Sequence, residues 1–382
     1  MRAVKTNAII AFALILIITI AVSLSASGQM TSQSKTDELL QNMSHNDSKV
    51  RAQAAWALGK SGDLKAIDPL IGALEDNDKN VREWAAIALK KIGGAALDPL
   101  QSALKSRNDS VRWQAAAILG MMNDSNATEA LCSVLKSNNS TVRYWAAAAL
   151  GEIKDTRSRD PLSSALAEVN DTVRDKAGWA IATLSGKETV DLLIGLLQDE
   201  NCSRRTGAAR ALGYRADAAA VQPLVAVLED PQDSVRREAI GALAAIGRPA
   251  TDALVRALNE SGNRSQEAAA EALGRIKDDR AIDPLIRAFE KGDSSVRHSA
   301  ATAVAAINAS SAVEPLISML QDLNAKEDLR SDAAWALGIM GDKRAKVPLI
   351  TAMSSDPDSG VRMSAAKAMK SVDGISVPEY KV

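Results

Sequence analysis

The chain of 382 residues contains one block that recurs eleven times, and this repetition constrains its fold more than any other feature. The signature of the block, V-R-x-x-A-A-x-A-L-G, first appears at residues 50–59, and successive copies lie 30 to 33 residues apart. A fixed period in this range predicts a stacked array in which each repeat contacts only its neighbours, rather than a closed globule. The copies open at Val50, Val81, Val111, Val142, Val173, Arg204, Val235, Ser265, Val296, Leu329 and Val361.

Each repeat predicts two helices. When the opening residue is counted as position zero, Ala stands at position four in all eleven copies, and position eight is Leu, Ile, Val or Met. Positions 0, 4, 7 and 8 share one face of a helix, which we call the signature helix. An upstream pattern, clearest at residues 66–74, contains Asp68-Pro69, which suits the first turn of a second helix. No segment has the period of a strand, so the sequence predicts an all-α array of eleven helix pairs.

Two further positions of the signature helix indicate how the repeats pack. Position nine is often Gly, which suits either close packing or a helix C-terminus; these are Gly59, Gly120, Gly151, Gly213, Gly274 and Gly338. Arg stands at position one in ten copies, with Gln266 as the exception. A row of Arg could bind phosphate, but we favour pairing with acidic residues of the turns, which would brace one repeat against the next. The expected partners are Asp47, Asp109, Asp171, Asp233 and Asp293.

The alternation of A-I-D-P-L-I-x-A-L with V-R-x-x-A-A-x-A-L-G resembles the HEAT repeat, in particular the HEAT-like repeat of the phycocyanobilin lyase (PBS lyase) type. The resemblance covers residues 36–373. It implies a right-handed α-solenoid with the signature helices on the concave side and with surfaces for protein partners. Some members act on bilin chromophores, and a related group binds iron through His-Glu pairs.

Residues 1–28 lie outside the array and have the layout of an export signal. Arg2 and Lys5 precede an apolar run at residues 8–24, and small residues follow it. The run would span roughly 25 Å as a helix, at the short limit for a membrane span. A cleaved signal peptide and a retained N-terminal anchor both remain open, and both predict an array outside the cytoplasm, secreted or at the membrane of an archaeal cell surface. Residues 29–35 are predicted to be a spacer and residues 374–382 a tail.

Twelve of the sixteen Asn residues stand in N-x-S/T sequences, which are acceptors for N-glycans in exported proteins. The alternative is that the turns between helices use Asn with a capping Ser or Thr, and that the repeats copy this pattern. The glycosylation candidates are Asn46, Asn108, Asn123, Asn126, Asn138, Asn170 and Asn308. Cys132 and Cys202 lie two repeats apart, too far for a disulfide.

Aromatic residues gather on the signature helices, at positions two, three and six, opposite the Ala-rich face. The predicted partner-binding residues are Trp56, Trp84, Trp113, Tyr144, Trp145 and Trp179. Such a stripe could anchor a protein or peptide partner or stack on sugar rings. Alternatively, each ring covers the small side chains of the neighbouring repeat. In the C-terminal half the same positions are mostly polar, which predicts a charged half; these residues are Arg210, Arg237, Glu238, Glu271, His298 and Asp332.

Motifs for catalysis and cofactors are lacking in the sequence. His45 and His298 are the only histidines, and neither forms a His-Glu pair. No zinc spacing or phosphate-binding loop appears, and a net charge of −1 gives no electrostatic case for nucleic acid. We therefore predict a non-enzymatic scaffold without cofactors or metals, which binds a protein or peptide and contacts the membrane only through its N-terminal segment. A lyase- or hydroxylase-like enzyme and a carbohydrate-binding surface protein are the alternatives.

Overall fold

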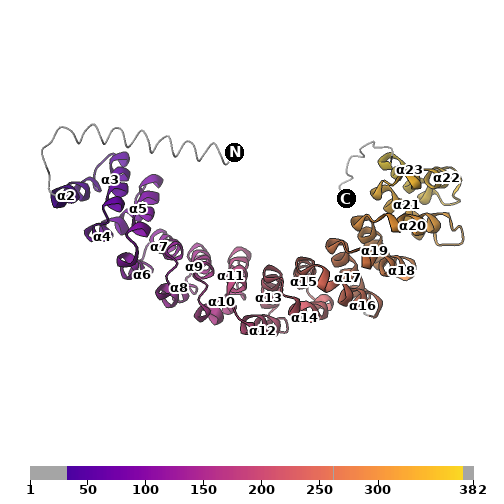
Figure 1. Cartoon of the computed structure of the whole chain (residues 1–382), viewed down its shortest axis with the longest axis horizontal. Helices are drawn as coiled ribbons and strands as arrows, with labels where there is room; N and C mark the ends of the chain where they lie inside the picture. Colours follow the sequence, from indigo (N-terminus) through magenta and orange to yellow (C-terminus); the bar gives the residue numbers. More distant parts are fainter. Residues whose placement is uncertain (1–31, 261, 373–382) are drawn as a thin grey trace. The chain divides into compact units, whose positions relative to one another are not determined.

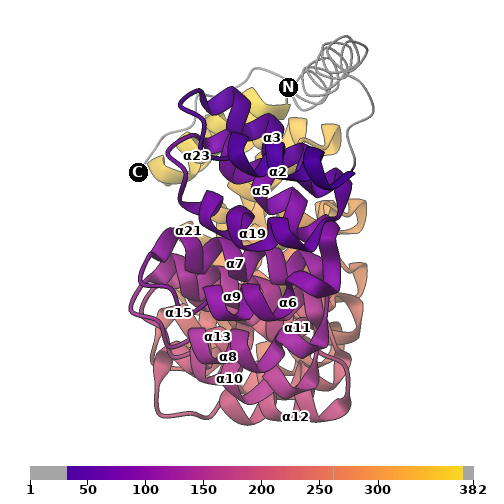
Figure 2. The ribbon, with the colours of Figure 1, turned by 90° about the vertical axis from the view of Figure 1, so that its left-hand side faces the viewer.

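The computed structural model describes residues 32–260 and 262–372 of the chain. Within these residues every regular element is a helix and none is a strand (Figures 1 and 2). The predicted all-α fold with eleven helix pairs is confirmed. The predicted export segment and the C-terminal tail lie outside the described residues, and the first of the described helices begins at Ser32, inside the predicted spacer.

The chain divides into two compact units, residues 1–127 and 128–382, and each is described by itself. Helices α2 to α7 belong to the first unit and α8 to α23 to the second. In both units the odd-numbered helices lie side by side in one row and the even-numbered helices in another (Figure 1). This is the arrangement that a stack of helix pairs requires.

The odd-numbered helices are the signature helices, and each carries one copy of the repeated sequence. They are α3 (Ser48–Ser61), α5 (Lys79–Ile92), α7 (Asp109–Met122), α9 (Ser140–Ile153), α11 (Asp171–Thr183), α13 (Cys202–Arg215), α15 (Asp233–Ile246), α17 (Asn263–Ile276), α19 (Ser294–Ile307), α21 (Glu327–Met340) and α23 (Ser359–Val372).

The even-numbered helices are the first helices of each pair, and several of them are only two turns long. They are α2 (Ser32–Asn42), α4 (Ile67–Gly72), α6 (Leu97–Ala103), α8 (Thr128–Val134), α10 (Arg159–Ala165), α12 (Lys187–Leu196), α14 (Val221–Ala226), α16 (Thr251–Glu260), α18 (Ile282–Lys291), α20 (Val313–Gln321) and α22 (Lys346–Ser355).

Single turns of 3₁₀-helix join or extend these helices. Those that precede a first helix are η1 (Leu64–Ala66), η3 (Gly93–Ala96), η4 (Ser125–Ala127), η5 (Thr156–Ser158), η6 (Ala218–Ala220), η8 (Arg248–Ala250), η9 (Asp279–Ala281), η10 (Ser310–Ala312) and η11 (Lys343–Ala345). Two more, η2 (Ala73–Glu75) and η7 (Val227–Glu229), follow α4 and α14.

Asp and Asn side chains start many of these elements. Asp63, Asp155 and Asp342 each accept a hydrogen bond from the backbone N–H two residues later, where the chain turns into a 3₁₀ helix. Asp47 and Asp78 do the same at the start of α3 and α5. Such caps satisfy backbone donors that a helix leaves without partners. The abundant carboxylates of the turns therefore have a structural role.

The alanine at position four of the signature helix forms the centre of the stack. It is buried in all eleven repeats, as predicted from the helical period. These residues are Ala54, Ala85, Ala115, Ala146, Ala177, Ala208, Ala239, Ala269, Ala300, Ala333 and Ala365. Because the side chain is a single methyl group, neighbouring signature helices can lie close together.

Glycine at position nine brings some neighbouring helices closer still. A Cβ added at Gly59 would lie 2.5 Å from the Cβ of Ala88, and one at Gly338 would lie 2.6 Å from the Cα of Ala368. Gly59 lies within α3, which ends two residues later at Ser61. Of the two roles that the sequence left open for this glycine, the structure supports close packing.

Arg297 bonds Asp328 and Asp332 on α21, and four other signature arginines clamp one repeat to the next with a geometry that they share. Each guanidinium reaches a carboxylate about 25 residues downstream, after the next first helix: Arg51 bonds Asp76, Arg143 bonds Glu168, Arg205 bonds Asp230 and Arg330 bonds Asp356. The backbone carbonyl of the same acidic residue accepts a hydrogen bond from the signature arginine of its own repeat, namely Arg82, Arg174, Arg236 or Arg362. One acidic residue thus joins the arginines of two repeats.

The sequence predicted that acidic residues of the turns pair with the signature arginines, and three of them do so, but within their own repeat. Asp109, Asp171 and Asp233 pair with an arginine three residues later in their own turn, and Asp47 and Asp293 cap the helix that follows them. Asp171 also bonds Arg210 of the next repeat, and Asp293 accepts a hydrogen bond from Asn263 of the preceding repeat. In the four clamps the partners are different. The bridging carboxylates come from the turn of the following repeat.

The clamps coincide with the glycines that allow close packing. The repeats whose arginine makes a clamp have Gly59, Gly151, Gly213 or Gly338 at position nine. At Gly274 the arginine is replaced by Gln266, and there the Asn263 amide donates to Asp293 at 2.6 Å. In four other signature helices position nine is not glycine. It is Lys90 in α5, Ala182 in α11, Ala244 in α15 and Ala305 in α19. Arg297 is an exception, because its repeat has Ala305 at position nine and still bonds Asp332 of the next repeat.

We expect Gly338→Ala to destabilise the protein by about 1–3 kcal/mol, because the added methyl group meets the backbone of α23. Gly241→Ala in α15 is the matched control, since nothing lies within 4 Å of its added Cβ. Because Ala has a higher helix propensity than Gly, this control substitution should stabilise the protein by up to about 1 kcal/mol. Urea denaturation followed by circular dichroism measures both. Equal effects at the two sites would contradict the close-packing argument.

The clamp gives a second prediction. The side chains of Arg330 and Asp356 are only 5% and 1% exposed, and the hydrogen bond from Arg330 lowers the pKa of Asp356. Arg330→Ala should cost about 3–5 kcal/mol because it leaves a buried carboxylate without its main partner. Arg344→Ala removes an exposed pair with Asp342 and should cost less than about 1 kcal/mol. Denaturation midpoints that shift equally in the two variants would show that the clamp adds no stability.

Candidate functional site

The candidate site is the face of the signature helices that points away from the Ala-rich core. We call it the signature face and define it by positions two, three, six and ten of each signature helix. Among the described residues, six of the twelve exposed large apolar side chains lie on it. They are Ile87, Met121, Tyr214, Trp335, Ile339 and Met363. The other six are spread over turns and first helices.

All six residues predicted to bind a partner lie on the signature face, and all are half-buried. In the first unit Trp56, Trp84 and Trp113 belong to α3, α5 and α7, and the ammonium group of Lys60 lies 5.5 Å from the ring centroid of Trp56. In the second unit Tyr144 and Trp145 belong to α9 and Trp179 to α11. Their partial burial means that these rings both contact neighbouring side chains and reach the surface.

The second unit brings three of these aromatics together around a cation. The rings of Tyr144 and Trp145 meet edge to face, with centroids 5.6 Å apart. The Lys176 ammonium lies 4.5 Å from the ring centroid of Trp179 and 5.4 Å from that of Tyr144. The ring of Trp179 also lies against Gly151 of the preceding signature helix, where a Cβ would collide with it. Trp179 therefore covers a small residue of the preceding repeat, so the covering role that the structural alternative gave to the rings applies to it, and it holds a cation as well.

A charged network continues this surface on α13 and α15. Arg210 bonds Glu238 at 2.7 Å and lies 3.3 Å from Asp171 and 3.5 Å from Asp175. Tyr214 donates its phenolic hydrogen to Asp175, and burial raises the pKa of Tyr214 to about 12, with Asp175 acting in the same direction. Three carboxylates thus surround one guanidinium beside the aromatic cluster. Arg174 also pairs with Asp171, so two guanidiniums face three carboxylates and the group carries one net negative charge.

The C-terminal part of the signature face is less polar than the sequence predicted. His298 lies against Trp335 with ring centroids 5.6 Å apart, and Trp335 is 37% exposed. Ile339 and Met363 are more exposed still. The polar residues named for this half are present, but Met363 at position two, Trp335 at position six and Ile339 at position ten make this part of the face mixed rather than charged.

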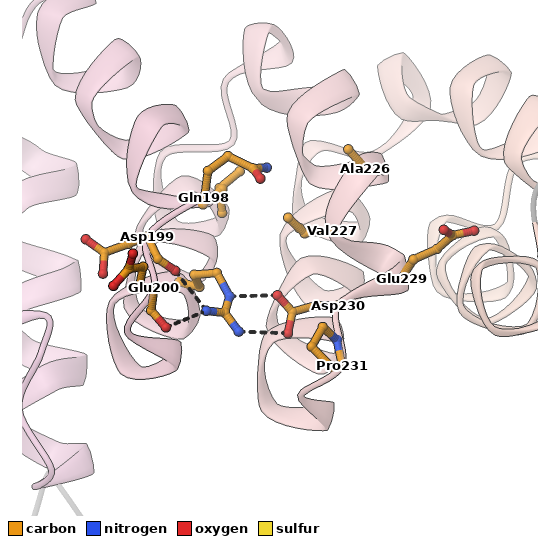
Figure 3. A pocket seen from close by; sticks show the side chains of 10 residues that line it. Gln198, Asp199, Glu200, Ala226, Val227, Glu229, Asp230 and Pro231 are labelled. Carbon is orange, nitrogen blue, oxygen red and sulfur yellow. Dashed lines mark hydrogen bonds and ion pairs between the residues drawn. The ribbon is translucent and has the colours of Figure 1, made fainter.

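A separate pocket of about 440 Å³ lies where the turn after α12 faces α14 and η7. Its lining includes Asp199, Glu200, Glu229 and Asp230, so it is acidic (Figure 3). The Arg205 guanidinium crosses it and bonds Asp230 at 2.7 and 3.1 Å and the carbonyl oxygens of Asp199 and Glu200. The clamp between two repeats therefore explains this pocket.

The seven glycosylation candidates are all exposed, but several have a structural role. Asn108 and Asn170 accept backbone hydrogen bonds at the starts of α7 and α11. Asn123 and Asn308 have φ near 55° at helix ends, a conformation that Asn tolerates better than most residues. Capping thus accounts for these four. Asn46, Asn126 and Asn138 lie exposed in turns.

Chemical groups for catalysis are not assembled in the described part of the chain. No group of three or more His, Cys, Asp or Glu side chains is placed to hold a metal ion among the described residues. Both cysteines are free, and burial raises the pKa of the Cys132 thiol to about 11, which keeps it protonated at neutral pH. None of the described helices combines the length and the apolar character that a membrane span needs.

The sequence matches a family model described as HEAT repeats at residues 36–111, 97–182, 160–243, 221–301 and 287–370. The chain belongs to the HEAT-repeat family. No curated protein matches the sequence. The narrower likeness to the phycocyanobilin-lyase type stays a prediction.

Among solved structures, Kap121p bound to Nup53p matches with a TM-score of 0.54 and 14% identity, over 91% of this chain and 46% of that one. Kap121p bound to Pho4p matches with a TM-score of 0.54 and 16% identity, over 93% and 47%. The chain thus spans about half the length of Kap121p, and the likeness concerns the fold. The complex of CpcE and CpcF of phycocyanin lyase from Nostoc sp. PCC7120 has a TM-score of 0.32 and 23% identity, over 64% and 94%.

Proposed function

We propose that the chain is a HEAT-repeat scaffold that binds a protein or peptide partner through its signature face. The observation that carries this proposal is the gathering of exposed large apolar side chains on that face, which holds six of the twelve found among the described residues. Apolar and aromatic side chains on a rigid helical surface are typical anchors of protein interfaces. Kap121p, which shares the fold, is described in complexes with protein partners.

A selection of displayed dodecapeptides on the purified protein tests this function. The face variant carries Ile87→Ser, Met121→Ser, Ile339→Ser and Met363→Ser, and it should bind the selected peptides at least tenfold more weakly. All four side chains are at least 47% exposed, so the folded protein should be retained. Fluorescence anisotropy measures the affinity.

The matched control carries Leu64→Ser, Val169→Ser and Val347→Ser, which remove exposed apolar side chains outside the signature helices. This variant should bind like the unmodified protein. Equal loss in both variants, or no selected peptide at all, would overturn the proposal. Binding of an oligosaccharide panel in place of peptides would favour the carbohydrate alternative.

The enzymatic alternative would need a catalytic group that the described residues do not bring together. A lyase or hydroxylase of the kinds that the resemblance implies should change the mass or absorbance of a bilin or a protein side chain. The exposed anchors on the signature face give no such chemistry, and so we favour binding over catalysis.

We also propose that the array works outside the cytoplasm, exported through residues 1–28 and either released or held by residues 8–24. The exposed sequons support this location, in particular Asn46, Asn126 and Asn138, for which the structure gives no capping role. Mass spectrometry of the protein from its natural membrane and secreted fractions tests it. Glycan on these three asparagines is the expected result, and a cytoplasmic, unmodified protein with an intact N-terminus would contradict it.

A further inference from the structure

The aromatic cluster of the second unit holds one of the chain's own cations. Lys176 lies three residues before Trp179 on α11, and its ammonium group lies within cation–π distance of both Trp179 and Tyr144. The two rings come from neighbouring signature helices, so the stacking of repeats fixes their separation. A cationic site is therefore built by the fold, and a flexible side chain occupies it.

Acidic groups adjoin this cluster. Asp175 precedes Lys176 in the sequence, and its side chain is 42% exposed, while that of Asp171 is 64% exposed. Both carboxylates lie near the guanidinium of Arg210, which also bonds Glu238. Of the three carboxylates, that of Glu238 lies closest to Arg210. Arg174 also pairs with Asp171, so two guanidiniums face these three carboxylates and leave one negative charge in excess beside the aromatic pair. An incoming cation would be attracted by both features.

We propose that Tyr144, Trp179 and Asp175 form a recognition site for an arginine side chain of the peptide partner, and that Lys176 occupies the site while the partner is absent. This rests on the proposed function of the signature face. A planar guanidinium can stack on an aromatic ring and pair with a carboxylate at once, which an ammonium group does less well. Lys176 has a long, flexible stem and can leave the rings without any change of backbone.

The test uses the peptides selected on the whole protein. Replacing their arginine with citrulline keeps the shape and removes the charge, and it should weaken binding about tenfold. Asp175→Asn should weaken binding of the arginine peptide and leave binding of the citrulline peptide unchanged. Lys176→Met should strengthen binding of the arginine peptide several-fold, because the competing cation is gone. Calorimetric titration measures each affinity.

The outcomes separate this inference from the function on which it rests. If the selected peptides lose binding to the face variant but tolerate citrulline, the scaffold function stands and the arginine site is refuted. If Lys176→Met lowers or does not change the affinity for the arginine peptide, Lys176 does not compete for the arginine site and the inference fails. A thermal scan accompanies each variant, and Lys176→Arg serves as the conservative control, which should bind the arginine peptide no better than the unmodified protein.

Discussion

The close approach of the signature helices is the constraint on which the rest of this structure depends. Alanine at position four and glycine at position nine leave so little between some neighbouring helices that an added Cβ would collide with the next backbone. Close packing of this kind gains dispersion energy over many atoms, and it excludes larger side chains from positions four and nine where the helices approach most closely. The aromatic side chains of the signature helices lie on the opposite face, where they can serve binding.

The arginine clamps act together with this packing. They occur where position nine is glycine, at the turn edge of the repeats, and their carboxylates are among the least exposed of the chain. A buried ion pair contributes little net stability compared with an apolar pair, but its geometry is specific. The clamps therefore fix the register of one repeat against the next, while the helices supply most of the stability.

Much of this fold could be predicted from the sequence because its main signal is periodic. The buried alanines and the pairing of helices follow directly from the spacing of the repeat. The partners of the arginines could not be predicted, since each lies about 25 residues away and is Asp in some repeats and Glu in one. The aromatic residues were placed on the correct face, yet the cation of Lys176 and the exposure of Ile339 depend on how neighbouring helices stack. Helical periodicity describes one helix, whereas these features belong to two.

Trp179 shows why structural and binding roles cannot be assigned by position alone. One side of its ring covers Gly151, a residue that must stay small for the helices to approach, and Lys176 lies over its ring as well. The same packing that hides part of the ring also immobilises it, so that little entropy is lost when a partner stacks on it. In a stack built on alanine and glycine, the rings that cover the gaps between repeats become the rigid anchors of the surface. Cover and binding site are then two consequences of one geometric requirement.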